Sequence, residues 1–174
     1  MEYIASFSGG KDSTATILLA HEHNEPLDKI IFSEVMLNEE ISGELPEHMD
    51  FIKNKAIPLF NEWGYKTEIL HGKKKYMDIF MAEPTKGKRK GSGMKVGFPM
   101  MGKCAVNKPC KIRPINDRIK QLGEVKQYVG IAADEPGRLE KLENTNKISL
   151  LAKYGYTEKM AFDICSDYCL LSQI

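Results

Sequence analysis

The 174-residue chain contains no run that approaches the roughly 20 apolar residues a membrane-spanning helix needs. Its first residues, Met-Glu-Tyr-Ile, lack the basic and then apolar pattern of a secretory signal, so we expect a cytoplasmic protein with no membrane partner. Neither sign of charge is in excess, and the formal net charge of +1 gives no global argument for nucleic-acid binding. Such a partner must be recognised by a local patch of charge.

Cysteine is scarce, and no two cysteines have the CxxC spacing. The four are Cys104, Cys110, Cys165 and Cys169. In this setting they indicate thiols, a metal site or redox chemistry rather than structural disulfides. Together they could hold zinc or an iron–sulfur cluster. The favoured interpretation of Cys165 and Cys169, predicted to share one face of a helix, is burial as small apolar side chains.

Short β-prone runs alternate with segments of helical periodicity along the chain. The predicted strands are residues 3–7, 29–35, 66–70 and 125–131, and the predicted helices are residues 12–21, 44–63, 112–122 and 157–170. This order predicts an α/β fold with an open, mostly parallel central sheet and helices on both faces. A flexible loop rich in glycine and lysine is expected at about residues 72–102. No repeat or linker is evident, so we expect one domain over residues 1–174.

The first predicted strand runs into the sequence Ser8-Gly9-Gly10-Lys11-Asp12-Ser13, termed here the phosphate loop, directly before a predicted helix. A short loop at this junction points backbone N–H groups and the positive end of the helix dipole at one spot, as a phosphate requires. The glycines permit close approach of the backbone, the lysine adds a cation and the serines add hydroxyl donors. The loop therefore predicts phosphate binding.

The phosphate loop is not a Walker A loop. That pattern needs a glycine five residues before Gly-Lys-Ser/Thr, whereas Ala5 stands there and Asp12 follows the lysine. An ordinary strand-to-helix turn with a helix cap at Asp12 or Ser13 is the alternative. The six residues instead resemble the Ser-Gly-Gly-x-Asp-Ser signature of the PP-loop ATP pyrophosphatases, also called adenine nucleotide α-hydrolases. This resemblance implies that Lys11 and Asp12 act in catalysis, that Asp12 positions magnesium, and that Ser6 joins the loop in binding the nucleotide.

Residues 130–138, Gly-Ile-Ala-Ala-Asp-Glu-Pro-Gly-Arg, carry a second resemblance. They look like the Gly-x-Arg-x-(Asp/Glu)-Glu-Ser-x-x-Arg stretch of phosphoadenosine phosphosulfate reductases, with Gly130 and Glu135 in agreement and Arg138 one position before the last arginine. An alanine and a proline replace that stretch's first arginine and its serine. Cys110-Lys111 ahead of Pro114 is similar to that family's cysteine before Lys-x-x-Pro. Residues 44–48 and 168–172 are similar as well, so the resemblance covers nearly the whole chain.

The reductase resemblance implies an enzyme of sulfur metabolism whose ligand is ATP or phosphoadenosine phosphosulfate. Lys111 and Arg138 would hold phosphate or sulfate oxygens, with Arg113 a weaker choice, and Gly130 and Glu135 would line the nucleotide site. Cys104, next to a lysine, would serve as a nucleophile. A thioredoxin-like protein would supply electrons.

Other functions stay open at this point. The reductases carry a Glu-Cys-Gly-x-His tail, and this sequence stops at Ser172-Gln173-Ile174 without one, so the reaction itself is undecided. The basic runs at residues 73–75 and 86–91 could contact a polyanion, which favours ATP-dependent adenylation for thiolation of tRNA or DNA as an alternative. The same loop could close over the nucleotide as a lid. A catalytically silent nucleotide-binding module is a further alternative function. The chain could also form a homodimer.

Overall fold

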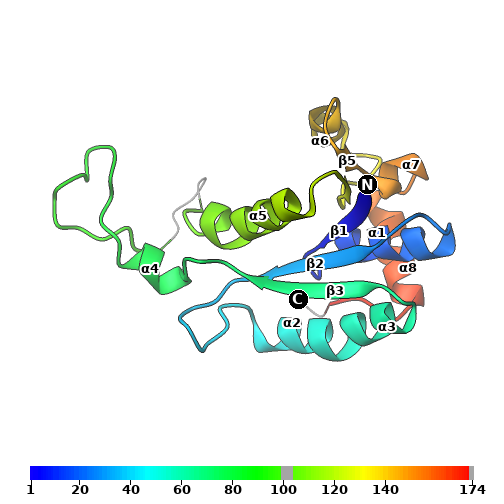
Figure 1. Ribbon diagram of the computed structural model, residues 1–174, viewed down its shortest axis with the longest axis horizontal. Helices are drawn as coiled ribbons and strands as arrows, with labels where there is room; N and C mark the ends of the chain where they lie inside the picture. The colour runs from blue at the N-terminus through cyan, green and yellow to red at the C-terminus, as the bar shows by residue number, and fades with distance from the viewer. Residues whose placement is uncertain (99–103, 173–174) are drawn as a thin grey trace. The chain divides into compact units, whose positions relative to one another are not determined.

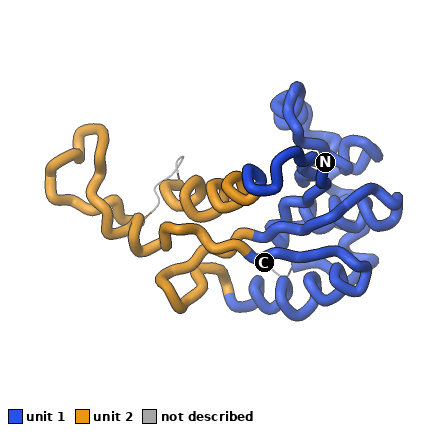
Figure 2. Tube along the Cα trace, viewed as in Figure 1, with its two compact units in different colours: residues 1–32, 46–69, 119–174 blue, residues 33–45, 70–118 orange. Residues whose placement is uncertain are grey.

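The computed structural model describes residues 1–98 and 104–172, and the chain divides into two compact units (Figure 2). Unit 1 comprises Met1–Phe32, Pro46–Ile69 and Ile119–Ile174, and unit 2 comprises Ser33–Leu45 and Leu70–Arg118. The end of the expected glycine- and lysine-rich loop, at residues 99–102, lies outside the described residues. The expectation of one domain over the whole chain stays a prediction.

A five-stranded sheet runs through the fold in the order β3-β2-β1-β4-β5 (Figure 1). Its strands are β1 Glu2–Phe7, β2 Lys29–Glu34, β3 Lys66–His71, β4 Val125–Tyr128 and β5 Lys147–Ile148. The central strand β1 pairs in parallel with both β2 and β4, and β4 pairs in parallel with β5. The predicted parallel sheet is therefore confirmed. The last predicted strand is shorter than expected, because β4 ends at Tyr128 and not at residue 131.

Helices connect and surround the strands. They are α1 Lys11–Glu22, α2 Pro46–Phe51, η1 Ile52–Ala56, α3 Ile57–Glu62, α4 Tyr76–Phe80, η2 Lys108–Ile112, α5 Arg113–Leu122, α6 Pro136–Leu139, η3 Glu140–Leu142, α7 Leu150–Lys153 and α8 Glu158–Asp167. All four predicted helices are present. The short elements α4, α6, α7 and β5 were not predicted. No helix of the described residues is long and apolar enough to cross a membrane.

Two π-helical turns, η1 and η2, directly precede α3 and α5, and the second residue of each of these two helices is a proline. In η1 the N–H of Ile57 donates to the carbonyl of Ile52, and Pro58 follows. In η2 the N–H of Arg113 donates to the carbonyl of Lys108, and Pro114 follows. Proline has no N–H to give to the preceding turn, so a wider turn at this point accommodates it within a continuous helical path.

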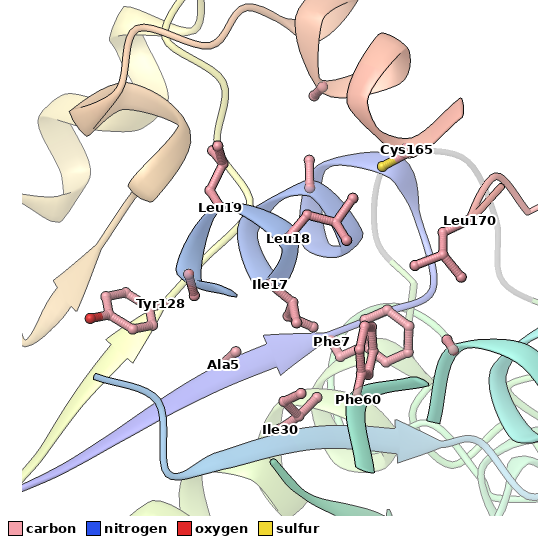
Figure 3. Close-up of a cluster of buried hydrophobic side chains, with 14 of the residues drawn as sticks. Ala5, Phe7, Ile17, Leu18, Leu19, Ile30, Phe60, Tyr128, Cys165 and Leu170 are labelled. Carbon is pink, nitrogen blue, oxygen red and sulfur yellow. The ribbon is translucent and has the colours of Figure 1, made fainter. Parts of the chain in front are cut away.

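The main hydrophobic core of unit 1 joins β1 to its flanking helices. Figure 3 shows Ala5 and Phe7 of β1 beside Ile17 of α1, with Phe60 of α3 also in the cluster. The neighbouring β1 residue Ile4, which points to the opposite face of the sheet, is also fully buried. A strand that is buried on both faces must be packed against other elements on both sides, and the prediction of helices on both faces of the sheet meets this requirement.

Unit 2 has a smaller core of its own, formed by Val35, Ile79, Val106 and Cys110. Ile79 belongs to α4, which lies within the segment expected to be an unstructured loop. The carboxylate of Asp78 accepts the N–H of Lys75 at 2.8 Å and so caps this helix. The loop prediction is corrected over these residues because a capped, partly buried turn of helix forms there.

Candidate functional site

Gly9 adopts a backbone conformation that only glycine tolerates well. Its φ is +76°, and an added Cβ would lie 2.4 Å from Cε1 of His48 and 2.9 Å from its Nε2. The phosphate loop turns sharply here, between the end of β1 and the start of α1. The predicted strand–loop–helix junction is therefore confirmed. The side chain of His48 of α2 fills the space beside Gly9.

Hydrogen bonds within the phosphate loop fix its shape. The Ser13 hydroxyl accepts the N–H of Ser8 at 3.1 Å and donates to the carbonyl of Gly10 at 2.9 Å. That carbonyl also accepts the N–H of Thr14 at 3.0 Å. Gly10 is the N-cap of α1 and supplies no side-chain cap. The alternative of a cap at Asp12 or Ser13 is wrong, because the helix already begins at Lys11.

The phosphate loop opens onto a cavity of about 400 Å³ within unit 1. Its lining consists of Ser6, Ser8, Gly10, Lys11, Asp12, Ser13, Val129, Gly130 and Arg138. Residues from the carboxyl ends of β1 and β4 thus meet the first turn of α1, as expected for a ligand site in an open α/β sheet. The structure brings together seven of the predicted binding residues, together with Arg138.

Gly130 allows the segment after β4 to approach α1 closely. A Cβ at this position would lie 2.6 Å from the carbonyl carbon of Asp12 and 2.7 Å from the amide nitrogen of Ser13. Such contacts with backbone atoms cannot be relieved by rotating a side chain. Any larger residue would therefore push the segment after β4 away from the first turn of α1.

The lysine of the phosphate loop is held by two carboxylates. Nζ of Lys11 lies 2.8 Å from Asp12 and 3.5 Å from Glu158 of α8. Partial burial alone would lower the pKa of Lys11, but the hydrogen bonds and charges of these two acids outweigh it and place its pKa above the ordinary value. Lys11 is thus firmly cationic at the cavity, and an anionic ligand must compete with the two acids for it.

Arg138 is paired in a similar way. Its Nη1 donates to both carboxylate oxygens of Glu135, at 2.6 and 2.8 Å. This hydrogen bond is the main reason that the pKa of Glu135 lies below its ordinary value, and the N–H of Ala132 adds to it at 3.1 Å. Glu135 therefore orients the arginine that lines the cavity. Its own predicted contact with a nucleotide is untested.

Three residues near the cavity were missed in the sequence. Gln127, buried in β4, donates from Nε2 to the hydroxyl of Ser6 at 2.6 Å. His48 lies 3.0 Å from the carbonyl of Ser8, and Glu158 contacts Lys11. Each partner is far away in the sequence, so no local pattern assigns these contacts. The signals available were a polar Gln127 inside a predicted strand and the place of His48 in residues 44–48, the segment that resembles the reductases.

Unit 2 contains the predicted site residues Cys104, Cys110, Lys111 and Arg113. Lys111 pairs with Glu44 at 3.0 Å, and Arg113 lines a separate cavity of about 330 Å³ together with Lys74 and Lys108, among others. Cys104 is exposed, as its predicted nucleophilic role requires. The phosphate loop and Arg138, in contrast, belong to unit 1. The predicted roles of Lys111, Arg113 and Cys104 in nucleotide chemistry stay predictions.

The cysteines differ sharply in their surroundings. Cys165 is fully buried against α1 (Figure 3), where its Sγ donates to the carbonyl of Lys11 at 3.3 Å and burial raises its pKa to about 12. Burial likewise raises the pKa of Cys110, whose Sγ donates to the carbonyl of Lys74 at 3.2 Å. Buried, protonated thiols of this kind are inert.

The expectation that Cys165 and Cys169 share a helix face is wrong for Cys169. Helix α8 ends at Asp167, and Cys169 is exposed with a φ of +54°. Among residues 1–98 and 104–172, no group of three or more histidine, cysteine or acidic side chains is arranged to hold a metal ion. The described residues thus do not form the predicted zinc or iron–sulfur site, and a magnesium role for Asp12 is untested.

No family model and no curated protein matches the chain. Among solved structures, the chain is similar to the U34-tRNA thiolase NcsA from Methanococcus maripaludis with its [4Fe-4S] cluster, at a TM-score of 0.57 and 16% sequence identity. The match covers 98% of this chain but only 57% of the thiolase chain. At this identity the similarity concerns the fold, and it agrees with the predicted α/β architecture.

Proposed function

We propose that the chain is an enzyme that binds ATP through the phosphate loop and activates an acceptor by transfer of the adenylyl group. The observation that carries this proposal is the cavity of about 400 Å³ at which the loop, the first turn of α1 and the glycine after β4 converge. Oriented amides, hydroxyls and a helix N-terminus at one point suit the phosphates of a nucleotide.

The charges around the cavity favour ATP accompanied by a divalent cation. Lys11 and Arg138 line the cavity, and each is already paired with acids, Lys11 with two of them. A bare triphosphate that binds Lys11 and Arg138 would have to compete with the three carboxylates with which these cations are paired. A cation such as Mg²⁺ would reduce this repulsion, and carboxylate oxygens are the ligands it prefers. We therefore favour ATP over phosphoadenosine phosphosulfate.

The chemistry would be attack of an acceptor on the α-phosphorus, with pyrophosphate as the leaving group. Lys11 and the amides of the phosphate loop would stabilise the charge that develops on the phosphate oxygens. Arg138, oriented by Glu135, would hold a second set of oxygens. In this reaction Lys11, Arg138 and the phosphate loop of unit 1 have electrostatic roles, and the acceptor is a separate molecule.

Isothermal titration with ATP in the presence of Mg²⁺ tests the proposal. Lys11→Ala should weaken binding about 10- to 100-fold, because a charged hydrogen-bond donor to phosphate is lost. Lys141→Ala is the matched control, since Lys141 is an exposed lysine of unit 1 outside the cavity lining. Tight binding that needs no Mg²⁺ and is seen only with phosphoadenosine phosphosulfate would instead support the reductase branch, with sulfite as the product to measure.

A nucleic acid is the acceptor that the charge of unit 2 favours. This unit holds 13 lysines and arginines against 7 aspartates and glutamates, a net charge of +6. The structural similarity to a tRNA thiolase points in the same direction. We therefore propose that the activated group is a site on tRNA or DNA that later receives sulfur. Radiolabel transferred from [α-³²P]ATP to the nucleic acid, dependent on both components, would support this acceptor, whereas labelling of small thiols alone would contradict it.

A further inference from the structure

His48 of α2 is in direct contact with the phosphate loop. Its Nε2 lies 3.0 Å from the carbonyl oxygen of Ser8, and its Nδ1 lies 3.4 Å from the hydroxyl oxygen of Ser172. A carbonyl oxygen can only accept, so Nε2 carries a proton and donates it. In the neutral ring, Nδ1 then accepts the hydroxyl proton of Ser172.

The imidazole ring also fills the space beside Gly9. An added Cβ at Gly9 would collide with it, at 2.4 Å from Cε1. On its other side, the ring of Phe32 meets the imidazole at an angle of 64°, with the ring centroids 6.4 Å apart. The histidine is therefore held in one orientation by packing and by hydrogen bonds at both nitrogens.

The direction of the loop's carbonyl groups decides whether the loop attracts or repels a phosphate. A peptide is a rigid plane, so turning a carbonyl toward the cavity places its negative end against the phosphate. The Gly10 carbonyl is occupied by Ser13 and Thr14. The peptide between Ser8 and Gly9 adjoins a glycine with positive φ, the residue type that resists such rotation least.

We propose that His48 is a positioning residue for phosphate binding: its Nε2–H holds the carbonyl of Ser8 away from the cavity and thereby fixes the anion-binding form of the loop. His48 is not among the cavity-lining residues, and the carbonyl of Ser8 is directed at its Nε2. The role rests on the proposed function, because it matters only if the loop binds phosphate. No catalytic contact with the nucleotide is assigned to His48.

Two substitutions distinguish the effect of the N–H donor of His48 from the effect of its aromatic ring. His48→Phe keeps an aromatic ring against Gly9 and Phe32 but has no donor, and His48→Gln keeps an N–H donor without the ring. We expect His48→Phe to weaken ATP binding about tenfold, the cost of one lost hydrogen bond that orders the loop. His48→Gln should stay within about threefold of the wild type. Adenosine, which has no phosphate, should bind all three proteins equally.

The outcomes separate the inference from the proposed function. If the wild type does not bind ATP, the proposed function fails. If the wild type binds ATP and His48→Phe binds it equally well, or both variants are equally weakened, the positioning role is overturned while the proposed function stands. Imidazole ¹⁵N spectra of the wild type need no variant: the neutral His48 ring should carry its proton on Nε2, and a proton on Nδ1 would overturn the inference.

Discussion

Unit 1 and unit 2 carry opposite net charges and use their basic residues differently. Unit 1 holds 12 lysines and arginines against 17 acids, a net charge of −5, whereas unit 2 has a net charge of +6. In unit 1 the two cations of the cavity are matched by nearby acids. In unit 2 cations outnumber acids by almost two to one. The first arrangement suits a small anion that arrives with its own metal ion, and the second suits an extended polyanion.

The two glycines beside the cavity also differ from Gly91 in the basic run of unit 2. Gly9 and Gly130 in unit 1 are in such close contact that an added Cβ would collide with neighbouring atoms, whereas Gly91 in unit 2 has no atom within 4 Å of that position. The close contacts of Gly9 and Gly130 fix the backbone beside the cavity, whereas no such contact constrains Gly91.

The largest expected effect follows from the close approach of Gly130 to α1. Gly130→Ala should weaken ATP binding at least about 100-fold, because the new methyl group displaces the segment after β4 from the first turn of α1. The overpacking should also cost about 1–3 kcal/mol of unfolding free energy. Isothermal titration and urea unfolding measure the two quantities.

Gly91→Ala is the control for that change. The added methyl group meets open space, so only the positive φ of +71° opposes it, at a cost of about 1–2 kcal/mol. ATP binding should be unchanged. Equal losses of ATP affinity in the two variants would show that the contrast between the units has no functional meaning.

The next effect tests the charge of unit 2. Replacing Lys86, Lys88, Arg89 and Lys90 together by alanine should weaken binding of tRNA or DNA at least about tenfold at low salt. The slope of log K against log salt concentration should become less negative by about 2 to 3, because phosphate contacts are lost. Fluorescence anisotropy over a salt series measures both. Binding of ATP, located in unit 1, should not change, and a nucleic-acid affinity unaltered by the four substitutions would remove the basis for a polyanion partner.

Cys165 makes the stability of unit 1 sensitive to alkaline pH. Burial raises the pKa of this thiol to about 12 in the folded protein, above the 9.0 of an unperturbed thiol, so its contribution is complete below pH 9 and falls as the pH rises toward 12. The expected loss is about 1.4 kcal/mol at pH 10. Cys165→Ala should show a smaller fall between pH 8.5 and 10 in urea unfolding. Tyr128, whose pKa burial also raises, contributes to both proteins and cancels in the comparison.

The longer elements of unit 1 could be predicted because each is specified by its own residues. The β-prone run before the phosphate loop and the Thr157 cap of α8, which accepts the N–H of Met160, are local signals. The helix end before Cys169 and the two-residue β5 have no comparable signal, since they depend on tertiary contacts. Unit 2 was predicted less well because glycine and lysine suggested a loop where α4 is held by its small core.

The site was predicted only as far as its residues share a motif. The phosphate loop and Gly130 were found, yet the reason for Gly130 is a backbone contact with Asp12, 118 positions away. His48 and Gln127 act through hydrogen bonds that span 40 and 121 positions. A single sequence does not show which distant positions contact one another, so these hydrogen bonds could not be predicted from it.

The smallest expected effect comes from removing the acidic charge of one ion pair in unit 1, with the same change to an ion pair of unit 2 as the comparison. Glu135→Gln in unit 1 should strengthen ATP binding about threefold, because it removes the negative charge that competes for Arg138, while the neutral amide oxygen still accepts hydrogen bonds and keeps the arginine oriented. Glu44→Gln in unit 2 frees Lys111 in the same way and should leave ATP binding unchanged. Stability should change by less than about 1 kcal/mol in both, as for other exposed ion pairs. An equal gain in the two variants, measured by titration at low salt, would instead show that the effect is not specific to Arg138.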